Sequence, residues 1–217
     1  MKRIIIPSVL NYDFNVIKTD LIELFENGVT HIHFDVLDGS LTQDIFDGFE
    51  YISSMTDIFD KYQIAKNIHL LTKHPENYLP LISKINVQQL RFHSDLLSQP
   101  ECDSLFNQFK NFADEVGIVI NPSSINDNNL LSKIDFAHVC NKDYFTNTIY
   151  TNDELAFIIS SIKSRSKQIQ IDGGVTSKNI KFYRDLGATF FISGGGIFSN
   201  QPLNSYLTLL NILEDTQ

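Results

Sequence analysis

The chain has 217 residues, of which 42% are hydrophobic, 12% are aromatic and 20% are charged. This composition excludes disordered, collagen-like and low-complexity proteins, and the length is enough for one large α/β domain with its own core. The formal net charge of -9 argues against a nucleic-acid partner, because an acidic surface repels the phosphodiester backbone. A small anionic ligand stays compatible with this charge, since backbone amides can hold a phosphate locally.

Cysteine usage and the N-terminal sequence indicate the compartment. Cys102 and Cys140 are too few for a disulfide framework and are typical of a reduced intracellular protein. The apolar run that ends at Pro7 is too short for a secretion signal, and no apolar stretch approaches the roughly 20 residues of a membrane span. We therefore expect a soluble, cytoplasmic protein with no membrane partner.

The first half of the chain alternates short β-rich runs with longer amphipathic segments. Residues 13–26 illustrate the amphipathic pattern, because apolar side chains fall on one helical face and Asn27-Gly28 then favour a helix end. The strands predicted in this half are residues 4–6, 31–35, 64–70 and 89–93. The helices predicted in this half are residues 13–26, 49–62, 75–82 and 101–114.

The second half continues this alternation without a linker or a low-complexity segment. Its predicted strands are residues 117–120, 136–140, 168–171 and 189–193. Its predicted helices are residues 124–131, 152–164, 177–186 and 203–213. Alternating strands and helices predict a parallel sheet, and eight such units fit a single-domain (β/α)8 TIM barrel over residues 1–217. Periodicity alone leaves a doubly wound open sheet as the alternative.

Polar side chains at the predicted strand ends favour the barrel, because the loops that follow barrel strands build the active site. His33 and Asp35 stand two residues apart on one strand, so both side chains point to the same face, the barrel interior. His69 ends the third predicted strand and Asp172 follows the seventh. Two imidazoles and two carboxylates at one barrel mouth suit Zn²⁺, Fe²⁺, Mn²⁺ or Co²⁺. The alternative is that each group is satisfied separately in the core.

The remaining histidines and a glycine run give weaker signals. His93 ends a strand and is compatible with a ligand or a core role, whereas we interpret His74 and His138 as incidental. Gly194-Gly195-Gly196 follow the eighth strand and leave backbone N–H groups uncovered. In barrels the loops after strands seven and eight often bind phosphate, although a plain turn explains the glycines equally well.

These residues make the chain resemble the ribulose-phosphate 3-epimerase family, whose members are (β/α)8 barrels. The motifs that carry the resemblance are Pro7-Ser8-Val9-Leu10, His33-Phe34-Asp35-Val36-Leu37-Asp38-Gly39, His69-Leu70-Leu71 with Pro75-Glu76, Asn121-Pro122, Asp172-Gly173-Gly174-Val175 and Gly194-Gly195-Gly196-Ile197-Phe198. They stand in the family's order over nearly the whole chain, so together they are far more specific than any one of them.

The resemblance implies a metal-dependent isomerase of pentose phosphate metabolism, a homo-oligomer that interconverts D-ribulose 5-phosphate and D-xylulose 5-phosphate. The implied ligands of one divalent ion are His33, Asp35, His69 and Asp172. The implied proton-transfer groups are Asp35 and Asp172. The implied substrate-binding residues are Ser8, His69, Asn121, Gly173, Gly174, Gly194 and Gly195.

The chain departs from the family pattern in three places, all beside the expected substrate pocket. Residues 141–147 contain neither glycine nor proline, where the family has a Pro-Gly-Phe-x-Gly-Gln loop. Residues 41–44 read Leu-Thr-Gln-Asp where the family has Phe-Val-Pro-Asn, and Gly194-Gly195 stand where it usually has Gly-Ser. In the divergent loop, Lys142 is either a phosphate contact or a solvated surface lysine.

These departures leave the substrate open. One alternative is an epimerase for a different ketose or ketose phosphate, and another is a catalytically impaired paralogue that only binds a sugar phosphate. A barrel decarboxylase or aldolase is disfavoured, because those chemistries typically rely on lysine and the nearest one, Lys66, lies three residues before His69.

Overall fold

The computed structural model describes residues 3–10, 12–122, 125, 131–166, 168–199 and 201–215. Within this part of the chain one nine-stranded sheet has the order β1-β9-β8-β7-β6-β5-β4-β2-β3. Its parallel strands are β1 (Ile4–Pro7), β2 (His31–Asp38), β4 (Ala65–Leu71), β5 (Val87–Phe92), β6 (Ala113–Val119), β7 (Phe136–Cys140), β8 (Ile169–Asp172) and β9 (Phe190–Ser193). The short strand β3 (Ile45–Asp47) pairs antiparallel with the end of β2.

The sheet closes on itself between β1 and β2. A parallel bridge joins Ser8 to His33, and the backbone N–H of Val9 donates to the carbonyl oxygen of His33 at 3.3 Å. On its other side β1 pairs in parallel with β9. The prediction of a parallel α/β barrel is therefore confirmed, and the open-sheet alternative is wrong.

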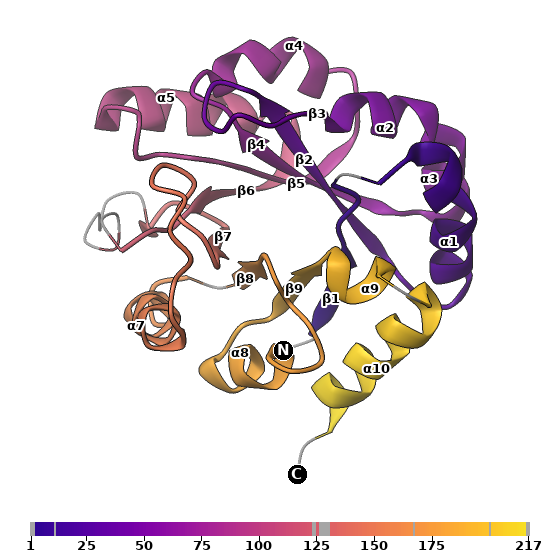
Figure 1. Cartoon of the computed structure of the whole chain (residues 1–217). Helices are drawn as coiled ribbons and strands as arrows, with labels where there is room; N and C mark the ends of the chain where they lie inside the picture. The colour runs from indigo at the N-terminus through magenta and orange to yellow at the C-terminus, as the bar shows by residue number, and fades with distance from the viewer. Residues whose placement is uncertain are drawn as a thin grey trace.

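The helices lie around the outside of the strands (Figure 1). They are α1 (Phe14–Glu26), α2 (Gly48–Ser54), α3 (Thr56–Tyr62), the 3₁₀ helix η1 (Pro75–Tyr78), α4 (Leu79–Ile82), α5 (Gln99–Phe109), α7 (Asn152–Ile162), α8 (Ile180–Leu186), α9 (Gly195–Phe198) and α10 (Pro202–Glu214). None of those in the described part of the chain combines the length and apolarity that a bilayer-spanning helix needs. Of the helix predicted at 124–131, all but Ile125 and Leu131 lie outside the described residues.

Two helix predictions are corrected by local backbone geometry. The helix expected at 49–62 is two helices, because the backbone leaves the helical region at Met55, with φ -120° and ψ 10°. The helix expected at 101–114 ends at Phe109, since Ala113 already pairs with Val87 in the sheet. A Ser98–Glu101 capping box fixes the start of that helix before the predicted position.

The two faces of the barrel strands carry different chemistry. On β2, Ile32, Phe34 and Val36 pack into the core between sheet and helices, while His33 and Asp35 alternate with them and face the barrel interior. Other interior positions on neighbouring strands, or directly after them, are also polar and at most 3% exposed: Asn67, His69, Gln89, Arg91, His93, His138 and Gln170. The interior of the barrel is therefore lined by polar side chains, and the candidate site lies among them.

Candidate metal centre and active site

Four side chains from three strands meet inside the barrel at the C-terminal ends of those strands. In the parallel register of β2 and β4, Asp35 is the neighbour of His69. Oδ1 of Asp35 lies 3.2 Å from Nε2 of His33 and 3.2 Å from Nδ1 of His69. Oδ2 of Asp172, at the end of β8, lies 3.6 Å and 3.7 Å from the same two nitrogens. We call His33, Asp35, His69 and Asp172 the carboxylate position.

The donor atoms of the carboxylate position fit a divalent cation. One ligand atom from each residue lies within 4.8 Å of the other three, and no residue of the set is more than 7% exposed. Among the described residues, Nδ1 of His69 has no hydrogen-bond partner although it is buried. Two imidazole nitrogens and two carboxylate oxygens in a buried cluster are a donor set that zinc, iron, manganese and cobalt accept. The cluster is thus consistent with a divalent metal site.

The far side of the His33 ring is held by two further buried side chains. Nδ1 of His33 lies 2.5 Å from Oδ1 of Asn67 and 2.9 Å from Nη1 of Arg91. Asn67 Oδ1 can accept from a protonated Nδ1, and that tautomer presents the Nε2 lone pair to a cation. Arg91 can instead donate to an unprotonated Nδ1. The ring orientation is therefore supported in either tautomer.

Amide side chains continue this network across the barrel interior. Asn67 donates through Nδ2 to Oε1 of Gln89 at 2.5 Å, and Gln170 donates to the same oxygen at 3.1 Å. Gln89 donates in turn to Oε2 of Glu115 at 2.6 Å. Such a connected network fixes the positions of buried polar groups, because each member would lose hydrogen bonds if it moved.

Electrostatics lower the pKa of both carboxylates in the ion-free protein. Burial alone would raise the pKa of Asp35, but the field of His33, its hydrogen bond with Asp35 and the nearby Nδ1 of His69 outweigh that effect and hold the pKa well below its usual range. The pKa of Asp172 is lowered in the same way against burial, by the field of His33 and by the nearby rings of His138 and His69. Burial lowers the pKa of Arg91 to about 10, so its guanidinium stays positive in the barrel interior.

The interpretation of His138 as incidental is wrong. His138 is fully buried on β7, and its Nε2 lies 3.3 Å from Oδ2 of Asp172. Its position two residues before the end of a predicted strand, facing the same way as Cys140, was the available signal. His93 also faces the cluster, with Nε2 3.1 Å from Nε2 of His69. Burial lowers the pKa of both His93 and His138.

The predicted substrate-binding residues lie at the ends of several strands. Ser8 is buried and bridges to His33, and its backbone N–H donates to the carbonyl oxygen of Ser193 at 3.0 Å. Asn121 is buried and donates through Nδ2 to Oδ2 of Asp95 at 2.8 Å.

Gly173 and Gly174 follow β8 with φ of 87° and 63°, which glycine adopts readily. The side chain of Asn141 packs against both of them, so a Cβ at either position would meet it. Gly194 packs against Ser8 at the end of β9, and an added Cβ at Gly195 would meet nothing within 4 Å. Of the four glycines, Gly195 therefore has the most open surroundings.

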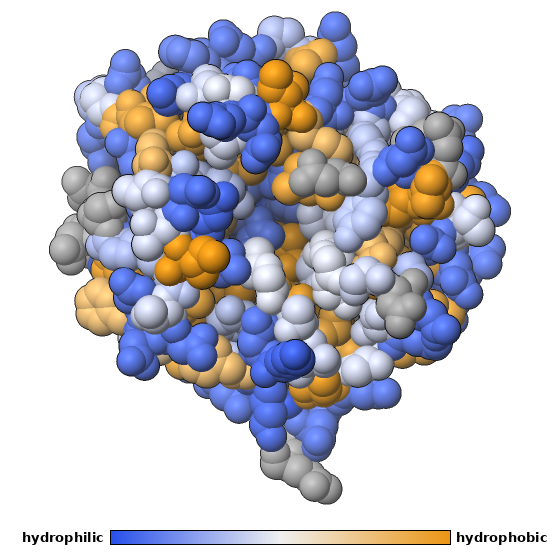
Figure 2. Space-filling view, viewed as in Figure 1, coloured by the Kyte–Doolittle hydropathy of each residue, from blue (hydrophilic) through white to orange (hydrophobic). Residues whose placement is uncertain are grey.

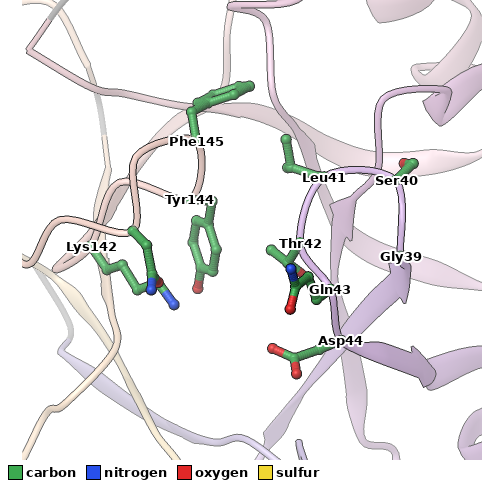
Figure 3. A pocket seen from close by; sticks show the side chains of 10 residues that line it. Gly39, Ser40, Leu41, Thr42, Gln43, Asp44, Lys142, Tyr144 and Phe145 are labelled. Carbon is green, nitrogen blue, oxygen red and sulfur yellow. The ribbon is translucent and has the colours of Figure 1, made fainter.

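A pocket of about 560 Å³ lies between the loop after β2 and the loop after β7. Figure 2 shows a hollow near the centre of the face on which the strands end, with hydrophilic side chains within it. Lys142 and Tyr144 face Thr42, Gln43 and Asp44 across the pocket (Figure 3). The Tyr144 ring also packs edge-on against the rings of His69 and His93, at 6.0 Å and 5.7 Å between centroids, and thereby joins the pocket to the cluster.

Comparisons with known sequences all point to the same protein family. The model of the ribulose-phosphate 3 epimerase family matches residues 4–198. The ribulose-phosphate 3-epimerase of Buchnera aphidicola subsp. Baizongia pistaciae is 22% identical, covering 96% of this chain and 94% of that protein. The ribulose-phosphate 3-epimerase of Encephalitozoon cuniculi is 25% identical, covering 95% and 93%, and that of Bacillus subtilis is 20% identical, covering 88% and 90%.

Comparison with solved structures supports the fold. The 3-hexulose-6-phosphate synthase of Salmonella typhimurium superimposes with a TM-score of 0.70 at 17% identity, and the match covers 98% of each chain. The orotidine 5'-phosphate decarboxylase of Pyrococcus horikoshii gives a TM-score of 0.66 at 13% identity, covering 97% of this chain and 99% of the other. At such identities the likeness concerns the barrel fold alone.

Proposed function

Because the chain belongs to the ribulose-phosphate 3-epimerase family, we propose that it interconverts D-ribulose 5-phosphate and D-xylulose 5-phosphate by proton transfer at carbon 3. The observation that carries the proposal is the convergence of Asp35 and Asp172 on one pair of histidines, with ligand atoms within 4.8 Å. Two carboxylates from different strands can serve the two faces of a substrate. A protein that only bound the sugar phosphate would have no need of two such acids.

The reaction exchanges a proton on one face of carbon 3 for a proton on the other. His33, Asp35, His69 and Asp172 would hold a divalent ion, which would supply Lewis-acid stabilisation of the negative charge that develops on the ketose oxygens. The histidine contacts use Oδ1 of Asp35 and Oδ2 of Asp172. We assign the other oxygen of each carboxylate to proton transfer at carbon 3.

In one direction an ionised carboxylate takes the proton from carbon 3, and the other aspartate, protonated, returns one to the opposite face. Adjacent carboxylates disfavour double ionisation when further negative charge develops between them, so the pair shares one proton during turnover. In the reverse direction Asp35 and Asp172 exchange roles.

Substrate orientation is assigned to the surrounding loops. Backbone N–H groups of Gly173, Gly174, Gly194 and Gly195 serve the phosphate, as the family resemblance implies. We assign Ser8, His69 and Asn121 to the sugar end, as the family resemblance implies. Lys142 adds a positive charge on the pocket wall.

The pocket wall favours a second candidate within the same chemistry, an epimerase for another ketose or ketose phosphate. Both loops that bound the 560 Å³ pocket, residues 39–44 and 142–147, are segments in which the sequence departs from the family pattern. Because they face each other across one pocket, they would set substrate choice together. The carboxylate pair and the proton transfer stay the same in this candidate.

Turnover in deuterium oxide tests both candidates. Purified protein loaded with Mn²⁺, Zn²⁺, Fe²⁺ or Co²⁺ is incubated with a panel of ketoses, each with and without its terminal phosphate. We expect deuterium at carbon 3 of the product, fastest with a pentulose 5-phosphate. Exchange that is fastest with another ketose supports the second candidate, and no exchange with any ketose supports an impaired binding paralogue and contradicts the proposal.

Three broader expectations belong to this proposal. Residues 1–217 form one domain, the protein is a homo-oligomer, and it works in the cytoplasm. The buried, unbridged thiols of Cys102 and Cys140 are compatible with a reducing compartment. Light scattering during size-exclusion chromatography tests the oligomer, and a monomer would contradict that part.

A further inference from the structure

The end of β7 brings two more side chains of metal-ligating types, His138 and Cys140, to the cluster. Cys140 is the neighbour of Asp172 in the parallel register of β7 and β8. One ligand atom from each of His69, His138, Cys140 and Asp172 lies within 4.8 Å of the other three. We call this set the thiol position. It shares His69 and Asp172 with the carboxylate position and offers an imidazole and a thiol in place of His33 and Asp35.

His138 has the surroundings of a ligand and not those of a core residue. Its side chain is fully buried, and within the described part of the chain neither ring nitrogen makes a hydrogen bond. Nε2 lies 3.3 Å from Oδ2 of Asp172, and the ring centroid lies 4.8 Å from that of His69. A buried polar atom without a partner is costly, and a cation between these groups is an interaction that would satisfy it.

Charge balance favours a thiolate when a cation is present. The two carboxylates of Asp35 and Asp172 neutralise one divalent ion, which leaves the guanidinium of fully buried Arg91 as an uncompensated positive charge. In the ion-free protein, burial and the carboxylates of Asp172 and Asp35 raise the pKa of the Cys140 thiol, and Arg91 opposes them. A thiolate at Cys140 neutralises the buried cluster, and buried charges are stable only when they are compensated.

We propose that His69, His138, Cys140 and Asp172 form an alternative coordination position for a thiophilic divalent cation such as Zn²⁺ or Co²⁺. The inference rests on the proposed function in one respect, that His69 and Asp172 hold a cation. Thiolate ligands select these ions over Mn²⁺ and Mg²⁺, which prefer oxygen. As the metal–sulfur bond forms, the thiol proton is released to solvent.

The two positions serve one ion and not two. His69 presents Nε2 to His93 at 3.1 Å, so Nδ1 is the nitrogen that remains for a cation. A single lone pair on Nδ1 binds one ion at a time. The chain therefore holds one cation whose ligands depend on its chemistry, with sulfur for Zn²⁺ or Co²⁺ and carboxylate for Mn²⁺.

Cobalt spectroscopy of the full chain tests this position directly. A thiolate bound to Co²⁺ gives a near-ultraviolet charge-transfer absorption that imidazole and carboxylate ligands do not give. Cys140→Ser removes the proposed ligand, and Cys102→Ser is the matched control because Cys102 is the other buried cysteine, on α5. Cobalt content, the charge-transfer absorption and carbon-3 deuterium exchange are measured on each protein.

We expect about one Co²⁺ per chain and the charge-transfer absorption in the wild type and in Cys102→Ser. Cys140→Ser should bind Co²⁺ without that absorption, and His138→Gln should bind it at least about tenfold more weakly. Wild-type protein without the absorption, with or without bound cobalt, overturns the proposal, as does binding of two ions. If the absorption is present but no ketose exchanges deuterium, the proposed function fails and the thiol position stands.

Discussion

Nη1 of Arg91 lies 2.9 Å from Nδ1 of His33, on the side of the imidazole ring that faces away from Asp35. A fully buried arginine thus stands beside a cluster with two buried carboxylates. In the ion-free protein its charge compensates part of theirs. When a cation is bound, the cation takes over that compensation.

The first prediction concerns the charge of the buried carboxylates, which Arg91 compensates in the ion-free protein and a bound cation compensates otherwise. Arg91→Met should lower the free energy of unfolding of the ion-free protein by about 3 kcal/mol, because it leaves buried carboxylates uncompensated. A saturating divalent ion should recover most of that loss, so the ion stabilises the variant more than the wild type. Chemical denaturation with and without the ion measures the difference.

Arg184→Met is the matched control for this prediction. Arg184 is also buried, but it lies on α8 and donates to the carbonyl oxygen of Ile212 at 2.7 Å. Its loss should destabilise the ion-free and ion-loaded proteins equally. The account of Arg91 is wrong if the ion rescues both variants to the same extent.

The second prediction concerns metal content. His69→Ala should lower the affinity for the metal ion at least about tenfold, because His69 belongs to both coordination positions. His74→Ala serves as the control, since His74 is an exposed histidine whose Nδ1 lies 3.4 Å from Oε1 of Glu76, away from the cluster. Elemental analysis after equilibrium dialysis measures both. Unchanged stoichiometry and affinity in His69→Ala would remove the cluster as the metal site.

The third prediction concerns pH and the loop that follows β2. Asp38 accepts hydrogen bonds from Ser40 N at 2.9 Å and from Thr72 Oγ1 at 2.6 Å. Burial raises the pKa of Asp38, and the bonds from Ser40 and Thr72 outweigh that effect, so the folded-state pKa lies below its ordinary value. Because the folded-state pKa is depressed, this stabilisation is full above the unfolded-state pKa of about 3.9 and is lost as the pH falls through the folded-state value.

Asp38→Asn should therefore be less stable than the wild type at neutral pH, by on the order of 1 kcal/mol. The difference should shrink as the pH falls below about 3.9, when the wild-type carboxylate is protonated too. Urea denaturation across that range measures it, with Asp60→Asn on α3 as the control. A difference that stays constant or grows toward acid contradicts the role of the Asp38 carboxylate.

The fourth prediction concerns Lys142 and the substrate's phosphate. Lys142→Ala should raise KM for a ketose phosphate about tenfold, which corresponds to about 1.4 kcal/mol, and leave the KM of the same ketose without phosphate unchanged. Lys133→Ala is the control, because Lys133 pairs with Asp103 at 2.8 Å and does not line the pocket. An equal effect of Lys142→Ala on both ketoses would mean that the lysine does not read the phosphate.

Much of the barrel follows from local patterns in the sequence. On β2, polar and apolar residues alternate in the sequence, and in the fold His33 and Asp35 face one side of the strand while Ile32 and Phe34 face the other. The elements that were missed are short or depend on distant partners. Strand β3 exists because it pairs with the end of β2, and the helix break at Met55 has no proline or glycine to mark it.

The site was harder to foresee where it depends on register. Cys140 and Asp172 are 32 residues apart in the sequence, and only the pairing of β7 with β8 makes them neighbours. The loop after β7 lacks the glycines of the family motif, yet it is ordered by its own bonds, with Asp143 N–H donating to Thr148 O at 2.8 Å and Tyr150 N–H to Asn141 O at 2.9 Å. Motif comparison could show only that the loop is different.

The central claim, that Asp35 and Asp172 act on opposite faces of carbon 3, is tested most directly by solvent exchange in single variants. Asp35→Asn and Asp172→Asn, each checked for bound metal, are incubated with each epimer separately in deuterium oxide. We predict that neither variant interconverts the epimers, and that each keeps slow carbon-3 exchange with only one epimer, a different one for each variant. Exchange of the same epimer in both variants, or near wild-type interconversion in either, would contradict the account.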